Sequence, residues 1–114
     1  MGLVLWIDQN TFATGLLEKV FKKKDLAFYT VPNARDFQFL VEDLRPSVVV
    51  LDTKTALADF EAFKTQYESM KSIPFILVDH HGELPMIENK AGEIKRPFDP
   101  FQIPEILNQI LKAN

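Results

Sequence analysis

The sequence contains no cysteine and only four glycines. Without cysteine there is no disulfide, no thiolate zinc site and no thiol nucleophile. The glycines are scattered along the chain, so no glycine-rich phosphate loop is present; they are Gly2, Gly15, Gly82 and Gly92. These absences exclude disulfide-stapled domains and disfavour nucleotide binding through a P-loop or a Rossmann turn.

Long hydrophobic runs and an excess of positive charge are also missing. The longest apolar runs are four or five residues, whereas a membrane-spanning helix needs about 20. The net charge is −3 and no basic stripe marks a nucleic-acid surface. No signal peptide is visible, because residues 1–7 lead directly into Asp8 without a basic start or a cleavage site. We therefore expect a cytoplasmic protein that binds neither membranes nor nucleic acid.

The chain is long enough for one domain with its own core. It has 114 residues, of which 46% are apolar, and single domains run from about 50 to 250 residues. No linker, repeat or low-complexity tract interrupts it. We expect residues 1–114 to form one domain, either standing alone or as the first domain of a longer protein.

Three short apolar runs each end at an aspartate. Residues 3–7 lead into Asp8, residues 48–51 into Asp52 and residues 75–78 into Asp79. Continuous apolar runs are typical of strands buried on both faces of a parallel sheet. Two more polar segments, 26–31 and 93–96, suit the edges of such a sheet.

Between these runs the apolar residues recur with the period of an α-helix. The pattern predicts four helices, within residues 12–21, 37–44, 60–70 and 103–111. Asn33 is a candidate N-cap, and Asp99 followed by Pro100 is typical of a helix start. We interpret the phenylalanine stripes as core, among them the stripe of Phe12, Leu16 and Val20 with Leu17 and Phe21 beside it. We interpret residues 22–24, three lysines, as a solvated helix end, with a partner-docking patch as the alternative.

The order of these elements predicts an α/β protein with a flavodoxin-like fold. Alternating strands and helices build a parallel sheet with helices on both faces. Three apolar strands between two polar edges favour the order 2-1-3-4-5 in a three-layer sandwich. Only sixteen residues separate Asp79 from Arg96, and they include Gly82, Pro85 and Gly92. We therefore expect the fourth helix to be shortened or missing.

The aspartates at the strand ends are the candidate site. Ligands of open parallel sheets bind beyond the carboxyl ends of the strands, where Asp8, Asp52, Asp79 and Arg96 should gather. Three carboxylates brought together repel one another and raise at least one pKa unless a cation compensates. Arg96 is the nearest cation, and we hypothesise an Asp79–Arg96 pair. The alternative is that each acid only forms a turn or caps a helix.

An Arg-Pro precedes the third expected strand and an Arg-Pro-Phe follows the fifth. With these motifs, and over residues 3–8, 45–52, 74–78 and 96–106, the chain resembles from end to end the receiver (CheY-like) domains of bacterial response regulators. The resemblance implies that Asp52 occupies the position that accepts a phosphoryl group from a histidine kinase. In the family pattern two acids after the first strand bind Mg²⁺, a Ser or Thr and a Lys contact the phosphoryl oxygens, and an aromatic residue acts as the switch.

The chain departs from that pattern at four positions. Neutral Gln9 replaces the second acid of the magnesium pair, so the resemblance leaves only a weak Mg²⁺ site on Asp8 and Asp52. Asp79 replaces the hydroxyl residue, and an ionised carboxylate repels a phosphoryl group. Arg96 replaces the lysine, with a different reach and geometry. Glu93 stands at the switch-aromatic position.

These departures favour a degenerate receiver, or pseudo-receiver. We expect a signalling module that is not an enzyme, carries no catalytic residue and binds a protein partner, with phosphorylation impaired or absent. The alternative is a working receiver of two-component signal transduction, phosphorylated on Asp52 by a histidine kinase. A sensor that holds a small ligand at the strand ends is a third, weaker option.

The resemblance also suggests where a partner would bind. In the family, the side formed by strand five and the last helix carries outputs and dimers, so a homodimer through this face is one expectation. Here residues 80–95 lie on that side and include Leu84, Met86 and Ile87. The alternative packs Leu84 and Ile87 into the core. A metal site on His80 and His81 is disfavoured, because adjacent side chains diverge and no further His or Cys exists.

Overall fold

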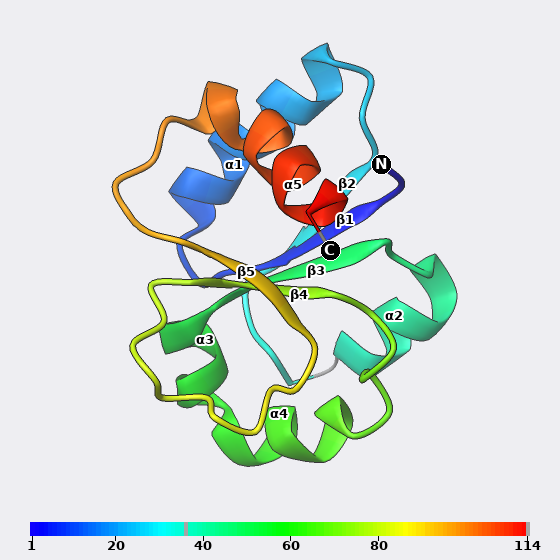
Figure 1. Ribbon diagram of the computed structural model, residues 1–114, viewed down its shortest axis with the longest axis vertical. Coiled ribbons are helices and arrows are strands. Elements are labelled where there is room, and N and C mark those ends of the chain that lie inside the picture. The colour runs from blue at the N-terminus through cyan, green and yellow to red at the C-terminus, as the bar shows by residue number, and fades with distance from the viewer. Residues whose placement is uncertain (36, 114) are drawn as a thin grey trace.

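The computed structural model describes residues 1–35 and 37–113, which form a five-stranded parallel sheet between two layers of helices (Figure 1). The strand order is β2-β1-β3-β4-β5, as the sequence predicts. The elements, in chain order, are β1 (Val4–Ile7), α1 (Thr11–Lys23), β2 (Phe28–Val31), α2 (Phe37–Leu44), β3 (Val48–Asp52), α3 (Thr53–Ala58), α4 (Phe60–Tyr67), β4 (Phe75–Val78), β5 (Lys90–Ile94), the 3₁₀ helix η1 (Pro100–Gln102) and α5 (Ile103–Lys112).

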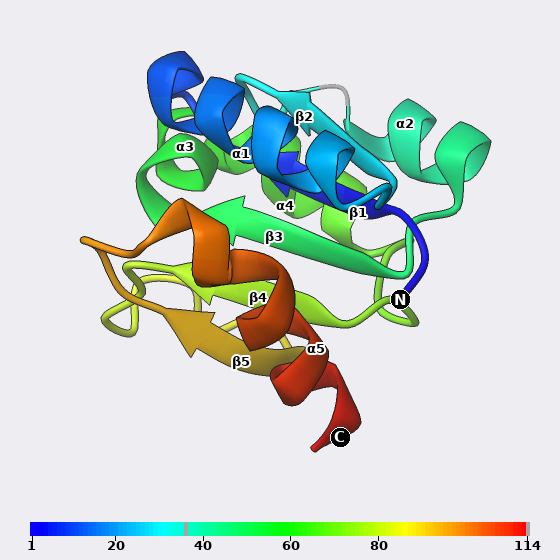
Figure 2. The same cartoon turned by 90° about the horizontal axis from the view of Figure 1, so that it is seen from above.

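The sheet separates two hydrophobic cores. Side chains alternate between the faces of a strand, so Val4 and Trp6 of β1 join one core while Leu5 and Ile7 join the other. Figure 1 shows α1 and α5 on one side of the sheet and α2, α3 and α4 on the other. In the view from above, α1 and α5 lie in front of the sheet and α4 lies behind it (Figure 2). β1, β3 and β4 are buried throughout, which confirms the interpretation of their apolar runs. In the described part of the chain no helix has the length and apolar character needed to cross a membrane.

Helix α1 buries only part of the apolar stripe expected of it. Its N-cap Asn10 accepts a hydrogen bond from the Ala13 amide, and Leu17 and Phe21 are fully buried against the sheet. Phe12 and Leu16, which the pattern placed in the core, are 79% and 41% exposed. The expectation is wrong for these two residues, although Val20 of the same row is buried, because the side of α1 that carries Leu17 and Phe21 is the one that packs against the sheet.

The connection from β4 to β5 contains no helix. Residues 79–89 form a loop, as the short spacing predicts. Leu84 of this loop is buried, and Met86 and Ile87 pack against the same core. The Tyr67 hydroxyl fastens the end of the loop by accepting from the Glu88 amide at 2.7 Å. The large apolar side chains of the loop therefore pack into the core, and none of residues 79–89 exposes a large apolar side chain to solvent.

The expected bounds of one strand and of one helix need correction. The fifth strand spans Lys90–Ile94 rather than 93–96, because Lys90 and Gly92, which carry little strand signal, pair with β4. Arg96 thus lies beyond the end of the strand. Asn33 accepts a hydrogen bond from the Arg35 amide in a turn, and α2 begins at Phe37. Asp99 does cap a helix start, since its side chain accepts from the Phe101 amide at the beginning of η1.

Candidate functional site

Asp8, Asp52, Asp79 and Arg96 meet at the carboxyl ends of β1, β3 and β4; we call these four residues the Asp–Arg cluster. Asp8 directly follows β1, Asp52 is the last residue of β3 and Asp79 directly follows β4. Asp8 and Asp52 are buried, with 1% and 4% exposure. The parallel sheet gathers the acids at one edge, as the strand pattern implies.

The Arg96 guanidinium contacts all three carboxylates. Nη1 donates to Asp52 Oδ1 at 2.8 Å and to Asp79 Oδ2 at 3.2 Å, and Nη2 donates to Asp8 Oδ2. The Arg96 backbone amide also donates to Asp79 Oδ1 at 2.8 Å. The hypothesised Asp79–Arg96 pair is present, but it is one part of a larger arrangement in which one cation bridges three anions. Charge-assisted hydrogen bonds of this kind are about twice as strong as neutral ones.

Asp52 is the N-cap of helix α3. Its Oδ2 accepts from the Thr55 amide at 3.0 Å and from the Thr55 hydroxyl at 2.7 Å. That hydroxyl in turn accepts from the Gln9 amide at 2.8 Å, so the ends of β1 and β3 are joined through Thr55. With Oδ1 held by Arg96, both carboxylate oxygens of Asp52 are engaged. Sequence reasoning missed Thr55, although an Asp three residues before a Thr, with no helix breaker between them, is a local capping signal.

Asp8 is held by its neighbours in the chain as well as by Arg96. The Trp6 indole donates to Asp8 Oδ2 at 3.3 Å and the Asn10 amide donates to Oδ1 at 2.9 Å. Burial nevertheless raises the pKa of Asp8 above its usual value, and the nearby charge of Asp52 acts in the same direction. The ionised Asp8 carboxylate is therefore a net cost to the fold at neutral pH.

The pKa of Asp79 is shifted in the opposite direction. The hydrogen bond from the Arg96 backbone amide, aided by the Arg96 side chain, lowers the pKa of Asp79. For Arg96 itself, burial opposes the charge, but the hydrogen bond to Asp52 and the charges of Asp8 and Asp52 outweigh burial and raise the pKa. Arg96 is thus a permanent cation in the cluster. Of the two acids whose pKa is shifted, Asp8 has a raised pKa and Asp79 a lowered one.

These opposite pKa shifts predict opposite pH responses for Asp8→Asn and Asp79→Asn. Protonation of Asp8 favours the fold as the pH falls, so the stability of Asp8→Asn relative to the wild type should decrease from pH 7 to about 4. The contribution of ionised Asp79 is lost only below its usual pKa, as the pH falls through the lowered folded pKa, so the deficit of Asp79→Asn should shrink on acidification below about pH 4. Urea unfolding followed by circular dichroism at each pH measures both. Parallel pH profiles for the two variants would contradict this assignment.

The cluster does not fit a magnesium ion in this arrangement. Every carboxylate oxygen of Asp8 and Asp52 already accepts a hydrogen bond, and the Arg96 guanidinium stands between the two side chains. Across residues 1–35 and 37–113, no group of three or more His, Asp or Glu side chains is arranged to hold a metal ion. The weak Mg²⁺ site expected on Asp8 and Asp52 would require Arg96 to move away.

The other positions singled out by the resemblance lie outside the cluster. The Gln9 side chain is exposed, and the residue contributes only its backbone amide, which donates to Thr55. Glu93, at the switch-aromatic position on β5, pairs with Lys90 at 2.9 Å, and its carboxylate lies 3.6 Å from His80 Nδ1. The hydrogen bond from Lys90 lowers the pKa of Glu93, so this side chain is an anion on the surface of the sheet edge.

Comparison with solved structures finds receiver domains that match almost the whole chain. Chemotaxis protein CheY4 of Vibrio cholerae superposes with a TM-score of 0.75 at 17% identity, covering 96% of this chain and 98% of that one. An orphan response regulator of H. pylori, HP1043, gives 0.73 at 18% identity and covers 96% of each chain. The receiver domain of a response regulator from Bermanella marisrubri gives 0.73 at 15% identity, covering 96% of this chain and 97% of that one.

The protein therefore has the fold of response-regulator receiver domains, the CheY-like variant of the flavodoxin-like architecture. By sequence, neither the protein-family models nor the curated proteins give a match. At these low identities the structural similarity shows the fold alone. The function of the site must therefore be inferred from the contacts that its own residues make.

Proposed function

We propose that the protein is a pseudo-receiver: a signalling module that binds a protein partner and does not use phosphorylation of Asp52 as its switch. The observation that carries this proposal is the Arg96 guanidinium, which bonds to all three acids of the cluster. It occupies the space next to Asp52 Oδ1 that an incoming phosphoryl group would need.

The state of Asp52 supports the same conclusion. A carboxylate that accepts a phosphoryl group needs a free oxygen as its nucleophile. Asp52 Oδ2 caps α3 through the amide and the hydroxyl of Thr55, while Oδ1 is bonded to Arg96. Phosphorylation would therefore break an N-cap or a charge-assisted hydrogen bond, and it would place a dianionic group beside Asp79. Each of these changes opposes the modification.

A titration with beryllofluoride and Mg²⁺ tests the proposal. In ¹⁵N-labelled protein, we expect no saturable change in the amide signals of Gln9, Thr53, Thr55 and Asp79. We also expect that acetyl phosphate with Mg²⁺ adds no phosphoryl group to Asp52 by mass spectrometry. Asp52→Asn is the control, because changes that persist in it do not come from the carboxylate.

Changes that saturate at low millimolar Mg²⁺ and disappear in Asp52→Asn would instead establish a working receiver. In that case a histidine kinase becomes the expected partner, and Arg96 becomes the residue that contacts the phosphoryl oxygens. The same titration thus separates the pseudo-receiver from the kinase-driven alternative.

A further inference from the structure

The sheet ends on one side at β2, whose outer edge has main-chain groups available for hydrogen bonding. β2 pairs with β1 alone. The Asp8 amide donates to the Val31 carbonyl, so the main-chain groups of Val31, and those of Tyr29 two residues earlier, face β1. The main-chain groups of Phe28 and Thr30 therefore face outward. Among residues 1–35 and 37–113, no group forms a hydrogen bond with these outward N–H and C=O groups.

The residues of β2 lack the features that usually protect an edge strand. Proteins block such edges with charged side chains, prolines or bulges. The opposite edge follows this rule, because β5 contains Lys90 and Glu93 and pairs with β4 through a shift of register. β2 consists of four uncharged aromatic or β-branched residues with high strand propensity, and Tyr29 among them is 44% exposed. The edge of β2 is therefore an open template for a further strand.

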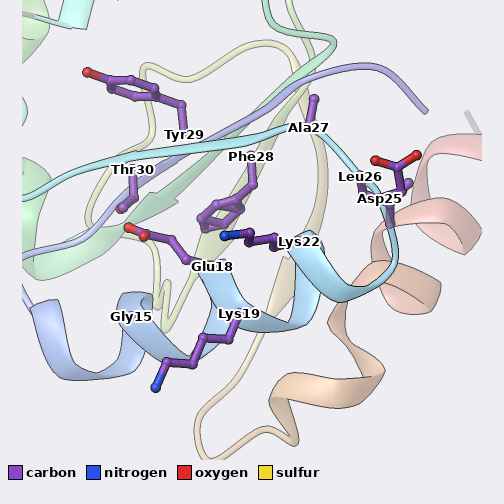
Figure 3. Close-up of a pocket in the computed structure, with 10 residues that line it drawn as sticks. All are labelled: Gly15, Glu18, Lys19, Lys22, Asp25, Leu26, Ala27, Phe28, Tyr29 and Thr30. Atoms are coloured by element: carbon purple, nitrogen blue, oxygen red, sulfur yellow. The ribbon is translucent and has the colours of Figure 1, made fainter.

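A cavity between α1 and β2 leaves room beside this edge. Its volume is about 820 Å³, and Gly15 of α1 lines it. A Cβ on Gly15 would meet no other group of the described residues within 4 Å, so α1 does not close over the strand at that point. Figure 3 shows Phe28 directed toward α1 and Tyr29 directed away from it, as alternate residues of a strand are. The charged side chains that line the cavity are two acids and two bases, Glu18, Asp25, Lys19 and Lys22.

The available hydrogen bonds select one register for antiparallel pairing of two β2 strands. The Leu26 amide already donates within its own chain, to a carbonyl of α1 at 2.9 Å, and Pro32 has no N–H. Neither residue can therefore complete a pair with a neighbouring strand. Phe28 and Thr30 are both satisfied when Phe28 of one copy lies opposite Thr30 of the other, because such a pair exchanges two main-chain hydrogen bonds. This register places the two copies of Tyr29 opposite each other at the two-fold axis.

We propose that the protein forms a symmetric dimer in which the β2 strands of two copies pair antiparallel and join the two sheets into one. Tyr29 would face Tyr29 on one side of the sheet, and Phe28 would face Thr30 on the other; aromatic and β-branched pairs of this kind stabilise neighbouring strands. A two-fold contact needs a self-complementary surface, and the equal number of acids and bases beside the edge meets that need. This inference rests on the proposed function, for which it names a second copy as the partner and β2 as the surface.

Sedimentation of the whole protein over a wide range of concentrations tests the dimer, and amide hydrogen exchange at the lowest and highest concentrations tests its surface. Both are measured without any phosphodonor. We expect a dimer whose population rises with concentration, and we expect the amides of Phe28 and Thr30 to exchange slowly only at high concentration. The amides of Tyr29 and Val31, which face β1, should exchange slowly at both.

Two substitutions of Thr30 give a matched comparison. Thr30→Pro removes the outward N–H, whereas the bonds to β1 remain, because proline is tolerated where the N–H of an edge strand faces solvent. One hydrogen bond is lost from each copy, so the Kd of the dimer should rise at least about tenfold. Thr30→Val is the control. Like proline, valine lacks the hydroxyl that donates to the Trp6 carbonyl, but it keeps the outward N–H and should dimerise as the wild type does.

Tyr29→Lys tests the same contact without changing the main chain. Like charges directly opposite each other destabilise a strand pair, so this variant should weaken the dimer, and added salt should partly restore it. Phe39→Lys is the control, because it introduces the same charge on α2 at a side chain that is 70% exposed and should leave the dimer unchanged. Circular dichroism checks that all four variants fold, and Tyr29→Lys decides the question if Thr30→Pro does not fold.

Three results would overturn the proposal: a protein that stays monomeric at every concentration, a dimer in which the amides of Phe28 and Thr30 exchange as fast as in the monomer, or a dimer that Tyr29→Lys leaves unchanged. None of these measurements depends on Asp52 or on Mg²⁺. Phosphorylation of Asp52 would overturn the pseudo-receiver proposal and leave the dimer standing. The failure of one proposal is therefore distinguishable from the failure of the other.

Discussion

Replacing Arg96 with glutamine is expected to lower the free energy of unfolding by about 3 kcal/mol at neutral pH. Removing one partner of a buried ion pair costs about 3–5 kcal/mol, and the Arg96 side chain, 27% exposed, places the cost at the lower end. Asp8, Asp52 and Asp79 would be left close together with no cation between them. Urea unfolding of Arg96→Gln against the wild type measures the difference.

The same variant should respond to MgCl₂. Once the guanidinium is gone, the carboxylates of Asp8 and Asp52 are freed for a hard cation, so millimolar MgCl₂ should raise the unfolding midpoint of Arg96→Gln but not that of the wild type. Arg35→Gln is the matched control, because the Arg35–Asp59 pair is 3.9 Å long with Arg35 61% exposed. Its effect should stay within about 0.5 kcal/mol. Equal stability of Arg96→Gln and the wild type would show that the cluster contributes nothing to the fold.

Replacing Asp52 with alanine should lower the free energy of unfolding by about 3 kcal/mol as well. Loss of an N-cap costs about 0.5–2 kcal/mol, and the buried Thr55 hydroxyl would lose its acceptor, which adds about 1–3 kcal/mol. The sign of this change in unfolding free energy decides whether Asp52 stabilises or destabilises the fold. If the three acids were held together against their repulsion, removing one of them would stabilise the protein.

Asp52→Asn separates the two roles of this side chain. Asparagine caps helices about as well as aspartate, so the contacts with Thr55 survive while the charge facing Arg96 is lost. We expect a loss smaller than that of Asp52→Ala, and a coupling energy with Arg96→Gln in a double-mutant cycle. Guanidinium chloride is unsuitable here because its salt content screens the cluster, so the measurement uses urea at low ionic strength. A stabilised Asp52→Ala would contradict the assignment of Asp52 as a structural residue.

The apolar strands could be predicted because each is a continuous run with a definite end. Residues 48–51 and 75–78 are short apolar runs typical of buried parallel strands, and the aspartates after them mark the edge of the sheet where ligands of such folds bind. The fifth strand was misplaced because an edge strand containing Gly92 packs against α5 by close approach, where a Cβ would meet Ile110 at 2.7 Å. A sequence pattern does not record such a contact.

The cluster itself was only half visible in the sequence. The ends of the strands show which acids lie close together. The position of the Arg96 guanidinium depends on the backbone conformation of the segment that follows β5, which the sequence does not predict. A single Asp79–Arg96 pair was therefore expected where one guanidinium spans three acids. The exposure of Phe12 was missed for a related reason, since helical periodicity identifies stripes but does not say which of two adjacent stripes faces the sheet.

The backbone of Asp79 bears on how the protein could change during evolution. Asp79 has a φ of +54°, in the left-handed region that aspartate and asparagine tolerate and β-branched residues do not. Placing the threonine of the receiver pattern at position 79 would add about 1–2 kcal/mol of backbone strain and remove the bonds to Arg96. This single substitution would therefore give a less stable protein. The local backbone thus opposes a hydroxyl residue at position 79, and an evolutionary path to one would first have to change the turn that follows β4.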